Sequence, residues 1–187
     1  MYKIAIFASG SGSNAENIAN YFKDNPVAEV VLLLTNKADA YVLERAKKLA
    51  IESVVFSSEQ LKSGELVELL EDKGIDFIVL AGFLLKIPEN LIAAFPNKII
   101  NIHPALLPKY GGKGMYGDAV HKAVVANKDK ESGITIHYVN EHYDEGTIIF
   151  QAKCKVSETD TYEEVAYKIH QLEYEHFPRV IEQILEA

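Results

Sequence analysis

Residues 4 to 102 alternate between two kinds of hydrophobic pattern. Short runs that are apolar on both faces predict buried parallel strands at Ile4–Ala8, Val30–Leu34, Val54–Phe56, Phe77–Leu80 and Ile99–Ile102. Between them, apolar residues at helical spacing predict helices at Ala15–Phe22, Val42–Leu49, Leu66–Glu71 and Ile87–Phe95. This alternation is typical of an open, doubly wound α/β sheet, mostly parallel, with helices on both faces.

The pattern changes after Tyr110, where a Gly-rich loop over residues 111–117 leads to a predicted short helix at Ala119–Ala126. Two β-rich runs follow, at Ile134–Val139 and Thr147–Val156. A parallel crossover needs about a dozen or more residues, so their short connection predicts an antiparallel hairpin. We therefore expect the sheet to end in a C-terminal antiparallel pair.

The last part of the chain reads as one helix. Thr161 and Glu164 have the spacing of a capping box, apolar residues recur behind them at roughly helical spacing, and Pro178 is expected to kink the helix. Glu173 falls on the apolar stripe. A carboxylate there either needs a hydrogen-bond partner or a ligand, or lies at the rim of the stripe with its charge in water. The sequence leaves both alternatives open.

The charge balance narrows the range of partners. The chain has 19 Lys and Arg against 27 Asp and Glu, a formal net charge of −8, and no dense Lys/Arg stripe that would mark a surface for nucleic acid. We therefore expect no nucleic-acid partner. Backbone N–H groups can still bind a small phosphate ester locally, so the net charge does not exclude an anionic substrate.

Length and cysteine content favour a single α/β domain over residues 1–187, long enough to bury a sizeable core. The single Cys154 excludes an internal disulfide, and the segment from Met1 lacks the layout of a signal peptide. The longest apolar runs are strand-sized, well short of the ~20 residues that cross a bilayer. We expect a cytoplasmic protein without a membrane partner.

The segment from Asn101 to Tyr110 places two reactive side chains at the end of an apolar strand. Because side chains alternate along a strand, Asn101 and His103 share a face that Ile102 does not. Pro104 ends the ladder and leaves His103 at the carboxyl edge, where open α/β sheets hold their ligands. An amide N–H can stabilise an oxyanion and an imidazole can transfer a proton near neutral pH. The plainer alternative is a turn-forming Asn and a loop-capping His.

The segment Ser9–Asn14 lies between the first predicted strand and helix and contains two glycines. Glycines let backbone N–H groups approach an anion, and a helix N-terminus adds partial positive charge, so a phosphate is the expected ligand. The glycine spacing formally matches a dinucleotide fingerprint, but the second strand lacks the acidic end that an NAD ribose requires. The alternative is a small-residue turn with Ser13 or Asn14 as the N-cap.

The hairpin connection, His137–Gly146, carries several polar groups. Asp144 followed closely by Gly146 is ordinary turn chemistry, and the functional alternative is a carboxylate that orients His103 or a water. The six histidines show no tight metal-ligand constellation, so we expect no metal.

Four segments together resemble the phosphoribosylglycinamide formyltransferases of purine biosynthesis. They are the Ser-Gly-Ser-Gly-Ser-Asn loop, the Ala-Gly-Phe turn at 81–83, Asn-Ile-His-Pro-Ala-Leu-Leu-Pro at 101–108, and the hairpin at 137–144. The resemblance spans nearly the whole chain and implies a single domain with a Rossmann-like formyltransferase fold. It also implies 10-formyltetrahydrofolate as the formyl donor and co-substrate, glycinamide ribonucleotide as the acceptor, and either a monomer or a homodimer.

The same resemblance implies a catalytic trio of Asn101, His103 and Asp144. Asn101 and a protonated His103 would stabilise the oxyanion of a tetrahedral intermediate. Asp144 would favour the imidazolium and relay the proton of the attacking amine through water.

The remaining implied residues bind the two substrates. Gly12, Ser13 and Asn14 match the family's phosphate-binding loop, and Glu173 falls where the family contacts the substrate ribose. The implied folate-binding residues are Leu84, Leu85, Lys86, Ile87 and Asn140.

Two features depart from the family pattern. The family often has an arginine near the helix around Leu61 that contacts the folate glutamate tail, but this chain has no arginine between Arg45 and Arg179, which leaves Lys62 as a substitute. The loop over residues 111–118 is longer and richer in glycine, so its substrate contacts cannot be transferred.

This function has three alternatives, two enzymes and one non-catalytic module. Methionyl-tRNA formyltransferase and formyltetrahydrofolate hydrolase belong to the same superfamily, and we expect neither, because each carries a further domain for which this chain shows no segment. The rival of another class is a non-catalytic module that binds a nucleotide or a folate. The presence of all three catalytic residue types argues against it.

Overall fold

The computed structural model describes residues 1–187 and is built on one seven-stranded sheet, in the order β3-β2-β1-β4-β5-β6-β7. The strands are β1 (Tyr2–Phe7), β2 (Ala28–Thr35), β3 (Glu52–Val55), β4 (Phe77–Leu80), β5 (Ile99–His103), β6 (Glu131–Tyr138) and β7 (Ile148–Lys155). The first five strands pair in parallel, and β6 runs antiparallel to both β5 and β7. The predicted mostly parallel sheet with a C-terminal antiparallel pair is confirmed.

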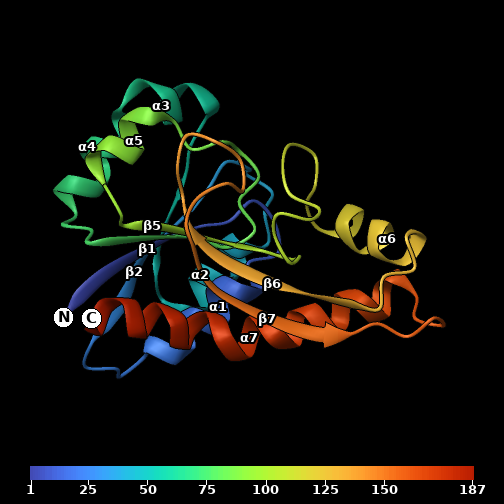
Figure 1. The fold of residues 1–187 in the computed structure, drawn as a ribbon. Helices are drawn as coiled ribbons and strands as arrows, with labels where there is room; N and C mark the ends of the chain where they lie inside the picture. Colours follow the sequence, from blue (N-terminus) through green and yellow to red (C-terminus); the bar gives the residue numbers. More distant parts are fainter.

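Helices cover both faces of the sheet, as Figure 1 shows. They are α1 (Ser13–Phe22), α2 (Val42–Leu49), α3 (Ser58–Ser63), α4 (Glu65–Asp72), α5 (Glu89–Ala94), α6 (Asp118–Ala126) and α7 (Tyr162–Glu186). Helices α1, α2, α6 and α7 contribute to one core, and α3, α4 and α5 to the core on the opposite face. None of these helices combines the length and the apolarity that crossing a membrane requires.

The helix boundaries correct the sequence analysis in two places. The helix predicted from Ile87 begins at Glu89, because Pro88 is extended and restricts the residue before it. Helix α3 was not predicted, although Ser57 and Gln60 form a capping box that is readable in the sequence. Both segments lie between strands, so neither error changes the order of the sheet.

The chain order of the strands creates the crevice that holds the candidate site. The chain moves outward from β1 to β3 and then returns to β4 on the other side of β1, and such a reversal opens a crevice at the carboxyl ends of the strands. Two hydrogen bonds join the loops there: the Ser9 N–H donates to the Gly82 carbonyl (3.0 Å) and the Leu84 N–H to Ser9 Oγ (3.0 Å). The loops after β1 and β4 are therefore fixed against each other.

Helix α7 continues through Pro178, and a side chain of α1 compensates for the proline. Proline has no N–H, so the carbonyl of Tyr174, one turn earlier, has no donor within the helix. Asn17 Nδ2 donates to that carbonyl at 3.0 Å. A side chain from a neighbouring helix thus supplies the hydrogen bond that the proline removes, and the kink expected at Pro178 stays a prediction.

We expect Asn17→Ala to lower the free energy of unfolding by about 1–2 kcal/mol, because the Tyr174 carbonyl loses its donor. The loss should shrink in a Pro178→Ala background, since alanine at that position restores the backbone N–H. Urea unfolding of the four proteins of this double-mutant cycle measures the coupling. Asn20→Ala, at an exposed position on the same helix, is the control. An equal loss in both backgrounds would contradict the explanation.

Candidate active site

A cavity of about 570 Å³ lies at the carboxyl ends of the central strands. Its lining comes from the loops after β1, β4 and β5, the β6–β7 connection, and helices α6 and α7. Apart from Lys62, it includes every site residue expected from the sequence: Gly12, Ser13, Asn14, Leu84, Leu85, Lys86, Ile87, Asn101, His103, Asn140, Asp144 and Glu173. Residues from distant parts of the chain are thus brought to one place.

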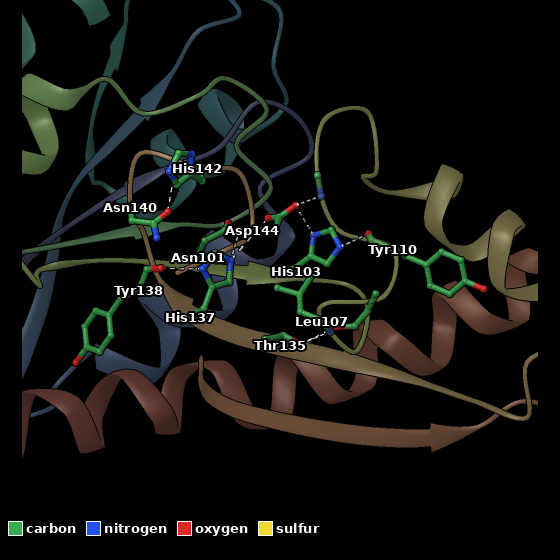
Figure 2. A network of polar contacts seen from close by, with 12 residues as sticks. Asn101, His103, Leu107, Tyr110, Thr135, His137, Tyr138, Asn140, His142 and Asp144 are labelled. Carbon is green, nitrogen blue, oxygen red and sulfur yellow. Dashed lines mark hydrogen bonds and ion pairs between the residues drawn. The ribbon is translucent and has the colours of Figure 1, made fainter. Parts of the chain in front are cut away.

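Asn101 and His137 face each other across the β5–β6 pair, where they are register partners. His137 Nδ1 lies 2.8 Å from the Tyr138 carbonyl, so this nitrogen carries a proton and donates it. Nε2 then accepts from Asn101 Nδ2 at 3.2 Å, as Figure 2 shows. One amide hydrogen of Asn101 is used in this way, and the other remains for a ligand.

His103 is almost fully buried, with 3% of its surface exposed. Its Nε2 donates to the Tyr110 carbonyl at 2.7 Å, and its Nδ1 lies 3.6 Å from Asp144 Oδ2 (Figure 2). Burial lowers the pKa of His103. The charge of Asp144 and the hydrogen bond to the Tyr110 carbonyl raise the pKa, but they offset only part of the effect of burial. Asp144 acts in the expected direction, but the imidazole of the free protein is neutral near pH 7. Desolvation thus outweighs the carboxylate in the free protein, and the protonated His103 expected in the reaction stays a prediction.

Asp144 is the carboxylate that the two histidines share. Its Oδ2 accepts from the Gly112 N–H at 3.0 Å, and its Oδ1 lies 3.7 Å from His137 Nε2. Burial raises the pKa of Asp144, but His137, His103 and the Gly112 N–H together lower it below its usual value. Its left-handed φ of 55° fits the turn role expected from the sequence, and its catalytic role stays a prediction. No group of three or more His, Cys, Asp or Glu side chains could hold a metal ion.

Tyr110, which was not among the residues predicted for the site, fixes the far side of His103. Tyr110 has a left-handed φ of 57°, and its hydroxyl donates to Asp129 Oδ2 (2.7 Å) and accepts from Asn127 Nδ2 (2.7 Å). These contacts hold the carbonyl that accepts from His103. The sequence could not predict this role, because the Tyr110 carbonyl accepts from His103 while the Tyr110 side chain contacts other residues.

The turn into α1 has the geometry of an anion site. Gly12 is the N-cap, with φ 72° and no side-chain cap, so the alternative in which Ser13 or Asn14 caps the helix is wrong. A Cβ at Gly12 would lie 2.4 Å from Val42 Cγ2, so α2 leaves no room for a side chain. The first helical hydrogen bond runs from the Glu16 N–H to the Gly12 carbonyl at 2.9 Å, which leaves the preceding N–H groups for a ligand.

Glu173 lies on α7 opposite this turn and is 5% exposed, so it is not at the rim of the apolar stripe. Its Oε2 accepts from Asn14 Nδ2 and from His170 Nδ1, both at 2.9 Å. The hydrogen bond to Glu173 raises the pKa of His170 against the effect of burial. The carboxylate therefore has the partners that its buried position requires.

The other end of the cavity is formed by the chain after β4 and by the β6–β7 connection. Ile87 is buried, Leu84 is exposed, and Asn140 Oδ1 accepts from the His142 N–H at 2.9 Å. Lys86 and Lys113 are the lysines that line the cavity. Lys62, the expected substitute for the family's arginine, is not part of the lining.

We expect the pKa of His103 to lie below the ordinary histidine value of about 6.5 and to fall further in Asp144→Asn, because the substitution removes the charge that favours the imidazolium. NMR titration of the imidazole measures both values, with the neighbouring groups fitted as a coupled set. Glu145→Gln removes the same charge from an exposed neighbour and should leave the titration unchanged. A His103 pKa that is equal or higher in Asp144→Asn would show that the carboxylate does not act on it.

The formyl transferase family matches residues 2–181. The chain is 45% identical over 191 residues to the chloroplastic phosphoribosylglycinamide formyltransferase of Arabidopsis thaliana, covering 98% of this chain but only 65% of that protein. It is 39% identical to the Bacillus subtilis phosphoribosylglycinamide formyltransferase, covering 99% of this chain and 95% of that protein. The crystal structure of the Bacillus halodurans phosphoribosylglycinamide formyltransferase, 37% identical, superposes with a TM-score of 0.88 over 98% of this chain and 95% of that chain. The chain therefore belongs to the formyl transferase family and, within it, to the phosphoribosylglycinamide formyltransferases.

Proposed function

We propose that the chain transfers a formyl group from 10-formyltetrahydrofolate to the amine of glycinamide ribonucleotide, directly and without a covalent enzyme intermediate. One observation carries the proposal: Asn101, His103 and Asp144 meet in the cavity between the N-terminus of α1 and a partly apolar loop. Such an arrangement suits a reaction between a phosphorylated and a largely aromatic substrate.

Each end of the cavity suits one substrate. The free N–H groups of the first turn of α1 match a phosphate, and Glu173 matches the hydroxyls of the attached ribose. Leu84, Leu85 and Ile87 offer apolar contacts to a pterin ring, and Lys86 and Asn140 add polar groups beside them. The reacting amine and the formyl group then meet near β5.

Formyl transfer to an amine passes through a tetrahedral adduct. The amine nitrogen bonds to the formyl carbon, the carbonyl oxygen becomes negative, and the nitrogen must lose a proton. The second amide hydrogen of Asn101 would stabilise the oxygen. His103, neutral in the free protein, would accept the amine's proton, and the resulting imidazolium would be stabilised by Asp144 and by the oxyanion. The proton would then pass to the folate nitrogen as its bond to carbon breaks.

We expect the breakdown of 10-formyltetrahydrofolate by this protein to require glycinamide ribonucleotide, because the amine is the nucleophile of the proposed reaction. Absorbance of the folate product, recorded with and without the acceptor, measures the dependence. Equal breakdown without the acceptor would mean that water is the nucleophile, and the chain would then be a hydrolase.

Asn101→Ala should lower kcat by about 100-fold or more and leave KM for both substrates nearly unchanged, as expected when one oxyanion donor is lost. Asn90→Ala is a matched control, because Asn90 lies outside the cavity and donates to the Lys62 carbonyl. Steady-state kinetics at saturating folate measures both variants. A kcat close to that of the unsubstituted protein would exclude Asn101 from the mechanism.

A further inference from the structure

Helix α6 carries a buried histidine that the mechanism above does not use. His121 is 2% exposed and lines the cavity, and its Nδ1 has no hydrogen-bond partner. Burial lowers the pKa of His121, and the charge of His170 lowers it further. The charges of Glu173 and Asp118 raise the pKa by less, so it stays below the ordinary histidine value. The imidazole is therefore neutral near pH 7, with one ring nitrogen as a donor and the other as an acceptor.

A second unpartnered polar atom lies in the same part of the cavity. Asn14 Oδ1 is buried and has no hydrogen-bond partner. Its orientation is set, because Asn14 Nδ2 donates to Glu173 Oε2 and a flipped amide would direct oxygen at a carboxylate. Asn14 Oδ1 can therefore only accept a hydrogen bond. Leaving such buried groups without partners costs free energy, which is typical of a site that completes its hydrogen bonds with a ligand.

These groups indicate which ligand chemistry fits. Asn14 Oδ1 and the Glu173 carboxylate are acceptors, and a neutral His121 both accepts and donates. A phosphate oxygen carries no proton to donate and would be repelled by Glu173. A hydroxyl group donates one hydrogen bond and accepts another, so it can pair with His121 and with an acceptor at once. The arrangement therefore fits neighbouring hydroxyls on a sugar ring.

We propose that His121 recognises a ribose hydroxyl of the acceptor and so makes the protein selective for ribosyl over deoxyribosyl acceptors. This inference rests on the proposed function, because the sugar belongs to glycinamide ribonucleotide. It assigns a substrate contact to the helix that follows the Gly-rich loop. A site whose polar groups are completed by a substrate hydroxyl discriminates strongly against an analogue that lacks it.

The test compares glycinamide ribonucleotide with its 2′-deoxy and 3′-deoxy analogues as acceptors. In the unsubstituted protein, kcat/KM should fall by about tenfold or more for at least one analogue. In His121→Leu, kcat/KM for the natural acceptor should exceed kcat/KM for that analogue by no more than about twofold, because the hydroxyl no longer has its partner. KM for the folate should not change. His121→Gln, which keeps a donor and an acceptor, should restore part of the selectivity.

Two controls separate this role from a structural one. Urea unfolding of the protein without ligand should give His121→Leu an equal or higher free energy of unfolding, since the substitution removes an unpartnered buried polar group. His176→Leu changes a histidine of α7 outside the cavity, which packs against the Phe150 ring, and should leave the selectivity unchanged.

Two results would overturn the inference while leaving the proposed function intact. One is an active protein that accepts both deoxy analogues as readily as the natural acceptor. The other is a folded His121→Leu variant that keeps the full selectivity. An unsubstituted protein that transfers no formyl group to glycinamide ribonucleotide would instead overturn the proposed function, and this inference with it.

Discussion

The carboxylate of Asp144 lies between His103 and His137, and the candidate site is arranged around it. A buried charge is costly unless it is compensated. Here the Gly112 N–H donates to the carboxylate at 3.0 Å, and the imidazoles of His103 and His137 lie 3.6 and 3.7 Å from its oxygens. Each of these groups belongs to a different segment: His103 to β5, His137 to β6, and Gly112 to the loop after Tyr110. The carboxylate therefore ties three segments to the hairpin connection that carries it.

This arrangement requires close backbone contact. A Cβ at Gly146 would lie 1.6 Å from the Tyr138 carbonyl oxygen, and a Cβ at Gly111 would lie 2.7 Å from Leu107 Cδ2. Glycine at both positions lets the hairpin connection pack against the end of β6 and lets the loop after Tyr110 pack against Leu107, with Asp144 beside the histidines. These two glycines therefore help to place Asp144 beside the histidines, in addition to giving the loops conformational freedom.

The sequence was informative where the chemistry is local. Pro104 marked the carboxyl end of β5, and alternation along the strand placed Asn101 and His103 on one face. The position of Glu173 on an apolar stripe left two alternatives open, and the structure shows a buried carboxylate with His170, one turn before it, as one of its partners. The contact between Asn101 and His137 could not be derived in the same way, because it depends on the register of β5 against β6. The extent of desolvation also cannot be derived from a sequence pattern, so the lowered pKa of His103 could not be predicted from the sequence.

Helices α1 and α7 join one end of the cavity to the core. Asn14 and Asn17 lie one turn apart on α1, and both donate to α7, to Glu173 and to the Tyr174 carbonyl. The second contact exists because Pro178 leaves that carbonyl free, so a proline in α7 helps to fix the helix whose N-terminus is the proposed phosphate site. Local N–H groups on a rigid helix can hold a phosphate in a protein with a net charge of −8, because the short-range field at the site outweighs a distant, screened net charge.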